Sequence, residues 1–291
     1  MSEAAICLKQ YINDHDYQKI EELKNLCIEK EDMFLKLELD YKLNAAQIRQ
    51  NEPFQHVNEF LYYCDDTLAG YIGICNFGGE AAELTGMVHP SFRRKGIFTK
   101  LYNLAKEECK RRNFKNILLV CDNKASSGQE FIKSTEAVYS FSEYEMSLEE
   151  NYVSEDSKNI VLRKASNNDA EELARQNNIY FGDVGRTLIM PEEEEKRNRI
   201  TYMVELNSKV IGKIRIDFST DEGFISGFGI LPEYRGKGYG REAIKAALYI
   251  LNKNDIHKAA LEVAAQNKNA LSLYKSCGFA EMSVTDYFED K

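Results

Sequence analysis

The feature of this sequence that most constrains its fold is an internal repeat. The segment from Met87 to Ile97 matches the segment from Gly229 to Tyr239, which begins 142 residues later. In each copy an apolar strand precedes a proline, and a helix-forming run follows a glycine, over residues 103–112 and 243–252. A repeat of this length predicts two domains with the same order of elements.

The match continues beyond this segment. Residues 117–120 parallel residues 260–263, and residues 131–134 parallel residues 273–276. A chain of 291 residues exceeds the roughly 100 to 200 residues of a typical domain, so two domains also fit its length. Residues 149–159 are polar and lack apolar periodicity, which is typical of a linker. We expect domains at 1–156 and 157–291, with the boundary near Ser157.

Strand and turn signals predict a meander of antiparallel strands before the glycine in each copy. Turns at Asn207-Ser208 and at Asp221-Glu222-Gly223 separate the strands of the second copy. Asn168-Asp169 predicts the start of an amphipathic helix there, and the opening of the first copy is longer and more helical. The expected strands are 57–64, 68–77 and 81–88 in the first copy and 160–164, 201–206, 210–218 and 224–230 in the second.

Composition excludes several classes of protein. A net charge of −9 argues against a large nucleic-acid surface and would attract cationic amines, although it can equally serve solubility. We expect a cytoplasmic protein, because the first ten residues do not resemble a signal peptide and no apolar run is long enough to span a bilayer. Seven cysteines without a close Cys-x-x-Cys pair and four histidines without ligand spacing predict no metal site.

The glycine-rich turn of the second copy, residues 235–240, lies between a predicted strand and a predicted helix. Glycine permits backbone shapes that let successive amides point into one space, and the following helix adds its positive end. Such a turn suits a diphosphate. The spacing is not that of a Walker loop, and a dinucleotide fingerprint belongs in a parallel βαβ unit rather than after an antiparallel meander.

In these residues the chain resembles the GNAT superfamily of acetyltransferases, whose signature is Arg/Gln-x-x-Gly-x-Gly/Ala. Arg235, Gly238 and Gly240 match the signature, and nearly the whole second half follows the family's spacing. The later matches are Leu261-Glu262-Val263, Asn267, Ala270, Leu273-Tyr274 and Gly278-Phe279. The resemblance implies an α+β fold of two tandem GNAT domains. Each would have a mixed, mostly antiparallel sheet, flanked by helices, with a splayed central strand pair.

The resemblance also implies acetyl-CoA as co-substrate. Amides from Gly236 to Arg241 would hold the diphosphate, while Phe228 and Ile230 would offer backbone groups to pantetheine. Asn267 would bond one of these two regions, and the alternative is a simple turn with an asparagine helix cap. The implied cofactor-binding residues are Phe228, Ile230, Arg235, Gly236, Lys237, Gly238, Tyr239, Gly240, Arg241 and Asn267.

The same resemblance implies two catalytic residues. Tyr274 would be the general acid toward the departing thiolate, and Glu262 the general base that accepts the amine's proton. A strand amide near Ile230 would stabilise the developing oxyanion. The alternatives are a core aromatic at Tyr274 and a glutamate at 262 that orders water or positions substrate; Glu205 is a weaker candidate for the base.

In the family, the segment between the first strand and Arg199 covers the acceptor groove. Here that segment contains aromatic residues beside carboxylates, which would suit an ammonium group, although the acidic run can also be a solvated helix end. The residues concerned are Tyr180, Phe181, Asp183 and Glu192 to Glu195.

The first copy departs from the signature. It keeps Arg93 and Gly96 but has Phe98 at the position of Gly240. Leu119 is expected in place of Glu262, and Phe131 or Ile132 in place of Tyr274. Glu136-Ala137 stands where Gly278-Phe279 is expected. A structural role is therefore expected for this copy, although its basic turn leaves phosphate binding open.

Together these features predict a GNAT-type acyltransferase whose C-terminal copy moves acetyl from acetyl-CoA to a primary amine. The amine would attack directly in a ternary complex, and it would belong to a small molecule or a peptide. The alternative is a noncatalytic CoA-binding sensor or scaffold. Neither nucleic acid nor a membrane is expected as a partner.

Overall fold

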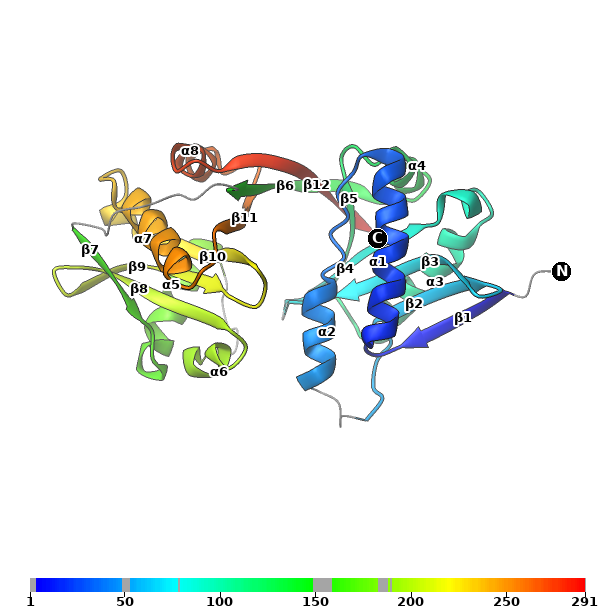
Figure 1. The fold of residues 1–291 in the computed structure, drawn as a ribbon, viewed down its shortest axis with the longest axis horizontal. Helices are drawn as coiled ribbons and strands as arrows, with labels where there is room; N and C mark the ends of the chain where they lie inside the picture. The colour runs from blue at the N-terminus through cyan, green and yellow to red at the C-terminus, as the bar shows by residue number, and fades with distance from the viewer. Residues whose placement is uncertain are drawn as a thin grey trace. The chain divides into compact units, whose positions relative to one another are not determined.

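The structure, a computed structural model, describes residues 4–48, 53–77, 79–148, 159–182, 188 and 190–290. The chain divides into two units by its contacts (Figure 1). One comprises Met1–Ser142 with Ser283–Lys291, and the other comprises Glu143–Met282. Each unit is an α+β sheet with helices packed on it, as the repeat predicts.

In the first unit the strands of the sheet lie in the order β1-β2-β3-β4-β5-β12. Neighbouring strands run antiparallel except β4 and β5, which are parallel. Its helices begin with α1, which a capping box at Asn13 starts. The elements are β1 (Ala4–Lys9), α1 (Asp14–Glu31), α2 (Leu39–Ile48), β2 (Glu59–Cys64), β3 (Thr67–Cys75), β4 (Ala81–Val88), α3 (Ile97–Arg111), β5 (Asn116–Asp122), α4 (Ser126–Lys133) and β12 (Ala280–Asp290).

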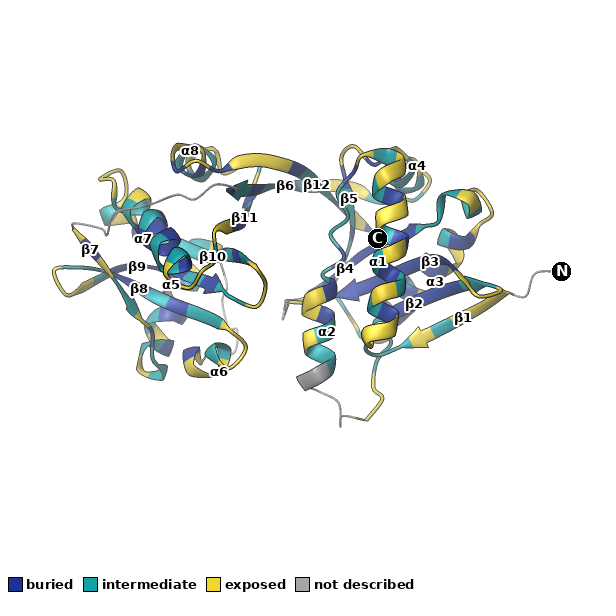
Figure 2. Ribbon diagram, viewed as in Figure 1, coloured by how far each residue is buried: buried dark blue, intermediate teal, exposed yellow. Residues whose placement is uncertain are grey.

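Apolar side chains cover both faces of this sheet, so strand β3 is buried almost throughout (Figure 2). On one face Leu101 of α3 packs with Ile72, and on the other Leu23 of α1 packs with Tyr71. Because alternate residues of a strand point to opposite faces, one strand supplies both cores.

The second unit repeats this plan with the sheet order β6-β11-β10-β9-β8-β7, in which β10 and β11 are the parallel pair. A capping box between Ser166 and Asp169 starts its first helical segment, close to the predicted start. The elements are β6 (Val138–Leu148), β7 (Ile160–Lys164), α5 (Ala170–Phe181), α6 (Pro191–Glu195), β8 (Arg199–Leu206), β9 (Lys209–Asp217), β10 (Glu222–Ile230), α7 (Tyr239–Lys253), β11 (Lys258–Ala264) and α8 (Lys268–Ser276).

The last strand of each copy completes the sheet of the other unit. Glu143 to Leu148 of β6 pair with β11, whereas Thr285 to Asp290 of β12 pair with β5. The buried Asp290 accepts hydrogen bonds from Tyr102 at 2.5 Å and Lys106 at 2.8 Å. Packing therefore follows the sheets rather than the consecutive stretches 1–156 and 157–291, and the expected boundary near Ser157 lies outside the described residues.

The predicted strands are present, with ends that shift by up to two residues. The expected strand 57–64 is β2 from Glu59, and the expected 224–230 is β10 from Glu222. Among the described residues, no helix is both long and apolar enough to cross a membrane.

The strand exchange makes a prediction about truncation. A chain that ends after Met282 loses the partner of β5, so β5 amides should exchange with deuterium at least about tenfold faster, while β11 amides keep their protection. Hydrogen exchange read by mass spectrometry measures both strands in one sample, and a chain that ends after Asp290 is the control. Loss of protection in β11 with β5 unchanged would show that the last strand stabilises the second unit instead.

Candidate active site

The site of the second unit begins where two parallel strands part. β10 and β11 pair from Glu222 opposite Lys258 to Ile225 opposite Leu261. β10 then bulges against β9, and Gly227 adopts a positive φ of 55° within the bulge. The splayed strand pair expected from the sequence is therefore present, and the end of β10 lies beyond the stretch paired with β11.

The glycine-rich turn follows β10 directly. Gly236 and Gly238 have φ values of 73° and 89°, and no atom lies within 4 Å of where a Cβ would stand on either. Among the described residues, the amides of Arg241 and Glu242 are the first after this turn to bond a backbone carbonyl, that of Gly238. The earlier amides, at the N-terminus of α7, can therefore hold an anion.

Gly240 serves a different purpose from the two glycines before it. It lies inside α7, and a Cβ there would stand 3.2 Å from Leu273 Cδ2 and 3.6 Å from Phe228 Cζ. A glycine at this position therefore leaves space for Leu273 and Phe228 at the start of the helix, and it is not needed for an unusual backbone conformation.

Charged side chains of the turn stabilise it through hydrogen bonds. Arg235 donates its Nε hydrogen to the carbonyl of Ile230 at 2.7 Å. Lys237 donates to the carbonyl of Glu233 at 2.8 Å, and Arg241 donates to Ser276 Oγ at 3.2 Å. Tyr239 packs partly buried against the core. These contacts fix the turn, while the backbone amides remain the groups best placed to meet a phosphate.

Tyr274 lies where α8 meets the splay. Its side chain is 7% exposed, and its ring centroid lies 6.5 Å from that of Phe228 and 6.2 Å from that of Phe279. Burial, with a smaller contribution from nearby Cys277, raises the pKa of Tyr274 to about 12. The phenol therefore keeps its proton at neutral pH and can donate it.

Glu262 lies on β11 one residue beyond the paired stretch. Leu261 and Val263 on either side of it are buried in the core beneath α7. Because residues alternate along a strand, half-buried Glu262 faces the opposite side of the sheet, across from Glu145 of β6. Glu205, the weaker candidate for the base, instead accepts a hydrogen bond from Arg163 Nε at 2.6 Å.

Asn267 caps helix α8. Its Oδ1 accepts a hydrogen bond from the amide of Ala270 at 3.1 Å, as the alternative reading of this residue expects. A role toward pantetheine would have to use the remaining amide group of the side chain.

The acidic and aromatic residues expected to receive an ammonium group are engaged by the protein itself. Arg235 lies over the ring of Tyr180 and Lys213 over the ring of Phe181, at 5.9 and 5.5 Å from the centroids. Tyr180 also covers β10, since a Cβ on Gly229 would stand 2.4 Å from its ring. The carboxylates of Glu192 to Glu195 contact Asn167, Lys196, Arg199 and Lys164 in turn, and Asp183 lies outside the described residues.

In the first unit the strand, turn and helix have the same backbone arrangement but different side chains. Arg93 Nε donates to the carbonyl of Val88 at 3.1 Å, and Gly96 has a φ of 75°. Arg94 takes the place of Gly236 with a φ of 63°. Phe98, in the place of Gly240, lies edge-on to Phe131 at 4.6 Å.

The structure also corrects the expected alignment of the two copies. The Phe98–Phe131 contact corresponds to the approach of Gly240 to Leu273, so Ile132 takes the place of Tyr274. The parallel pairing ends at Leu119 in β5 and at Leu261 in β11. The residue in the place of Glu262 is therefore Val120, and not Leu119 as expected. Val120 and Glu262, like Ile132 and Tyr274, are 142 residues apart, the same offset as in the glycine turn.

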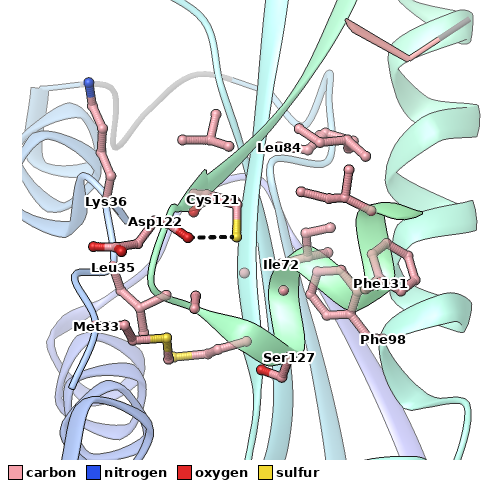
Figure 3. Close-up of a pocket in the computed structure, with 18 of the residues that line it drawn as sticks. Met33, Leu35, Lys36, Ile72, Leu84, Phe98, Cys121, Asp122, Ser127 and Phe131 are labelled. Carbon is pink, nitrogen blue, oxygen red and sulfur yellow. Dashed lines mark hydrogen bonds between the residues drawn. The ribbon is translucent and has the colours of Figure 1, made fainter. Parts of the chain in front are cut away.

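A cavity lies in the first unit, where β4 and β5 part. It encloses about 700 Å³, part of it open to solvent, between the loop after α1, the two strands and α4 (Figure 3). Sequence reasoning missed this cavity, because its lining residues are scattered along the chain and share no motif.

Comparison with known proteins identifies the family to which this fold belongs. The model of the acetyltransferase (GNAT) family matches residues 18–133 and again residues 167–279. An uncharacterised N-acetyltransferase of Bacillus subtilis is 33% identical over 121 residues, which cover 40% of this chain and 72% of that protein. The ribosomal protein bS18 alanine N-acetyltransferase of Escherichia coli is 27% identical over 85 residues, which cover 29% of this chain and 57% of that protein.

Solved structures share the fold over nearly the whole chain. A GCN5-related N-acetyltransferase from Sphaerobacter thermophilus superposes with a TM-score of 0.79 at 15% identity, covering 99% of this chain and 95% of that one. A tandem GNAT protein from the clavulanic acid biosynthesis pathway superposes with a TM-score of 0.68 at 13% identity, covering 99% and 98%.

The cap at Asn267 gives a test of what this residue does. Asn267→Ala removes the oxygen that bonds the Ala270 amide, and should lower the free energy of unfolding by about 1 kcal/mol. Asn267→Ser keeps a capping oxygen and should restore most of that stability, as denaturant titration measures. Equal stability of Asn267→Ala and the parent protein would contradict the capping role.

Proposed function

Because this chain belongs to the acetyltransferase (GNAT) family and is an acyltransferase, we propose that its second unit transfers acetyl from acetyl-CoA to a primary amine. The observation that carries the proposal is the meeting of three features at one place. The glycine turn, the splayed end of β10 and the buried hydroxyl-bearing Tyr274 all border the same space around Gly240 and Phe228.

The residues of the second unit fit acetyl-CoA. The open sides of Gly236 and Gly238 leave the turn amides accessible to a diphosphate, and the positive end of α7 favours its charge. The backbone of Phe228 and Ile230, in the part of β10 beyond the paired stretch, can bond the amides of pantetheine. The thioester would then lie toward Tyr274.

In the proposed reaction the neutral amine attacks the thioester carbon, so a C–N bond forms while the C–S bond breaks. Tyr274 gives its phenolic proton to the departing sulfur and is reprotonated from solvent. The amide of Ile230 is the candidate donor to the carbonyl oxygen as negative charge develops there. Most of the rate enhancement would come from aligning the two substrates.

Glu262 is the proposed base. It lies at the start of the splay and faces the side of the sheet opposite α7. A carboxylate there can accept the proton that the attacking amine loses, directly or through a water. Glu205 is not proposed, because Arg163 holds it in an ion pair.

The acceptor is proposed to be the amine of a small molecule or a peptide. The relatives include enzymes named for ribosomal-protein alanine, 27% identical, and for spermidine, 45% identical over 53 residues that cover 31% of that enzyme. Release of the CoA thiol with members of an amine panel would support transfer. Binding of acetyl-CoA without thiol release for any amine would favour a noncatalytic sensor.

The acid role of Tyr274 gives the second test. Tyr274→Phe keeps the ring but removes the proton, so single-turnover transfer should slow by about 10- to 100-fold while acetyl-CoA binding persists. With its pKa raised to about 12, Tyr274 stays protonated through pH 10, so the parent enzyme should show no alkaline loss from this group below that pH. An unchanged single-turnover rate in the variant would remove Tyr274 from the chemistry.

Gly240 gives a test that locates the cofactor. Gly240→Phe fills the space bounded by Leu273 and Phe228, and should abolish acetyl-CoA binding in calorimetric titration. Gly240→Ala meets only the flexible end of Leu273 at 3.2 Å, and should keep binding within about tenfold of the parent.

Phe98→Leu, the matched change in the first unit, should alter acetyl-CoA binding little. Normal binding by Gly240→Phe, together with lost binding on mutation of Gly96, would place the cofactor in the first unit and refute the assignment.

A further inference from the structure

We propose that the cavity of the first unit binds a neutral, largely apolar small molecule through the hydroxyls of Thr85 and Thr285. Its walls are mostly apolar and include Ile72, Leu84 and Phe131 (Figure 3). The space of about 700 Å³ includes a part that is open to solvent, through which a small molecule can enter. Apolar walls favour a ligand that is itself mostly apolar.

Two buried hydroxyls supply the polar contacts. Thr85 lies on β4 just past the last pair with β5 and is 5% exposed, and Thr285 lies on β12 and is 4% exposed. Both residues line the cavity, where their hydroxyls can meet a bound molecule. Each hydroxyl can donate and accept a hydrogen bond, so a ligand with a neutral amide or carbonyl group would gain polar contacts there.

The charged groups of the lining are already engaged. Asp122 accepts hydrogen bonds from the amides of Phe34 at 2.9 Å and Lys124 at 2.6 Å. Lys36 donates to Tyr287 at 2.9 Å. Arg93 pairs with Glu31 at 2.9 Å and donates to the carbonyl of Val88. The charged side chains of the lining are therefore already paired and would not bind a charged ligand, which favours a neutral one.

The same unit lacks the features that would admit a CoA diphosphate. Phe98 and Phe131 meet edge-on at the position where the second unit has Gly240 and Leu273. Arg94 replaces the open Gly236, so a side chain stands where that glycine leaves space. The ligand would therefore enter the hollow between the strands without the phosphate contacts of the second unit.

Cys121 provides a reporter within the cavity. Its Sγ lies 3.3 Å from the carbonyl of Asp122 and lines the wall near α4 (Figure 3). Burial raises its pKa to about 12, so alkylation should be slow but measurable. Cys7, on β1 and outside the cavity, is an internal control in the same sample.

The experiment compares three probes of equal chain length: hexanamide, hexanoate and hexylammonium. Modification of Cys121 by N-ethylmaleimide is followed by peptide mass spectrometry in the full-length protein. Saturating hexanamide should slow alkylation of Cys121 at least about threefold and leave Cys7 unchanged. Hexanoate and hexylammonium should protect far less, because each would bury an unpaired charge.

Two variants test the hydroxyls. Thr85→Val and Thr285→Val keep the side-chain shape, and each should weaken hexanamide affinity by roughly 2- to 12-fold, the effect of one hydrogen bond. Thr201→Val changes a threonine buried to 8% exposure in the other unit, and should leave the affinity unchanged.

Three results would overturn the proposal. They are no protection by hexanamide up to its solubility, equal protection by the charged probes, and protection by acetyl-CoA in the Gly240→Phe protein. The last would show that the first unit takes the cofactor itself. Failure here leaves acetyl transfer by the second unit untouched, because that function is read from thiol release.

Discussion

The structure depends on a parallel strand pair that stops pairing after four residues, at Ile225 and Leu261 in one unit and at Leu84 and Leu119 in the other. Beyond that point the strands diverge, and buried backbone groups and side chains need other partners. In the second unit a bulge in β10 and the glycine turn follow this point. In the first unit Phe98 and Phe131 meet edge-on near this point, and a cavity lies between the diverging strands.

The exchange of the last strands gives each unit one strand from the other copy of the repeat. β12 is eleven residues long, and buried Tyr287, stacked on Phe141 with centroids 4.4 Å apart, lies among residues of the first unit. A first unit that lost its own chemistry would still be required, because its sheet needs β12 and its own chain supplies β6 for β11. This offers a physical reason why a copy without the signature glycine persists in the chain.

The sequence predicted the repeat, the order of the elements and the glycine turn, because each depends on local patterns such as Pro232, Gly238 and the strand periodicity. The splay was expected only from the family resemblance. It could not predict the strand exchange, since β6 and β12 carry similar alternating patterns and would suit either sheet. The one-residue error at Leu119 came from aligning residues 117–120 with 260–263, because a short apolar run matches 259–262 equally well. Pairings such as Arg163 with Glu205, and the cavity, depend on residues brought together only by folding.

Comparison of the two copies separates residues that the fold needs from residues that chemistry would need. Arg93 and Arg235 each donate Nε to the carbonyl at the end of the preceding strand, and Gly96 and Gly238 each take a positive φ at the start of the helix. These pairs are the same in both units because both units must make this turn. Gly240, Glu262 and Tyr274 differ from Phe98, Val120 and Ile132, although the surrounding backbone is alike. A turn of this kind folds without them, so the proposed cofactor site and the proposed acid and base rest on the residues by which the second unit differs from the first.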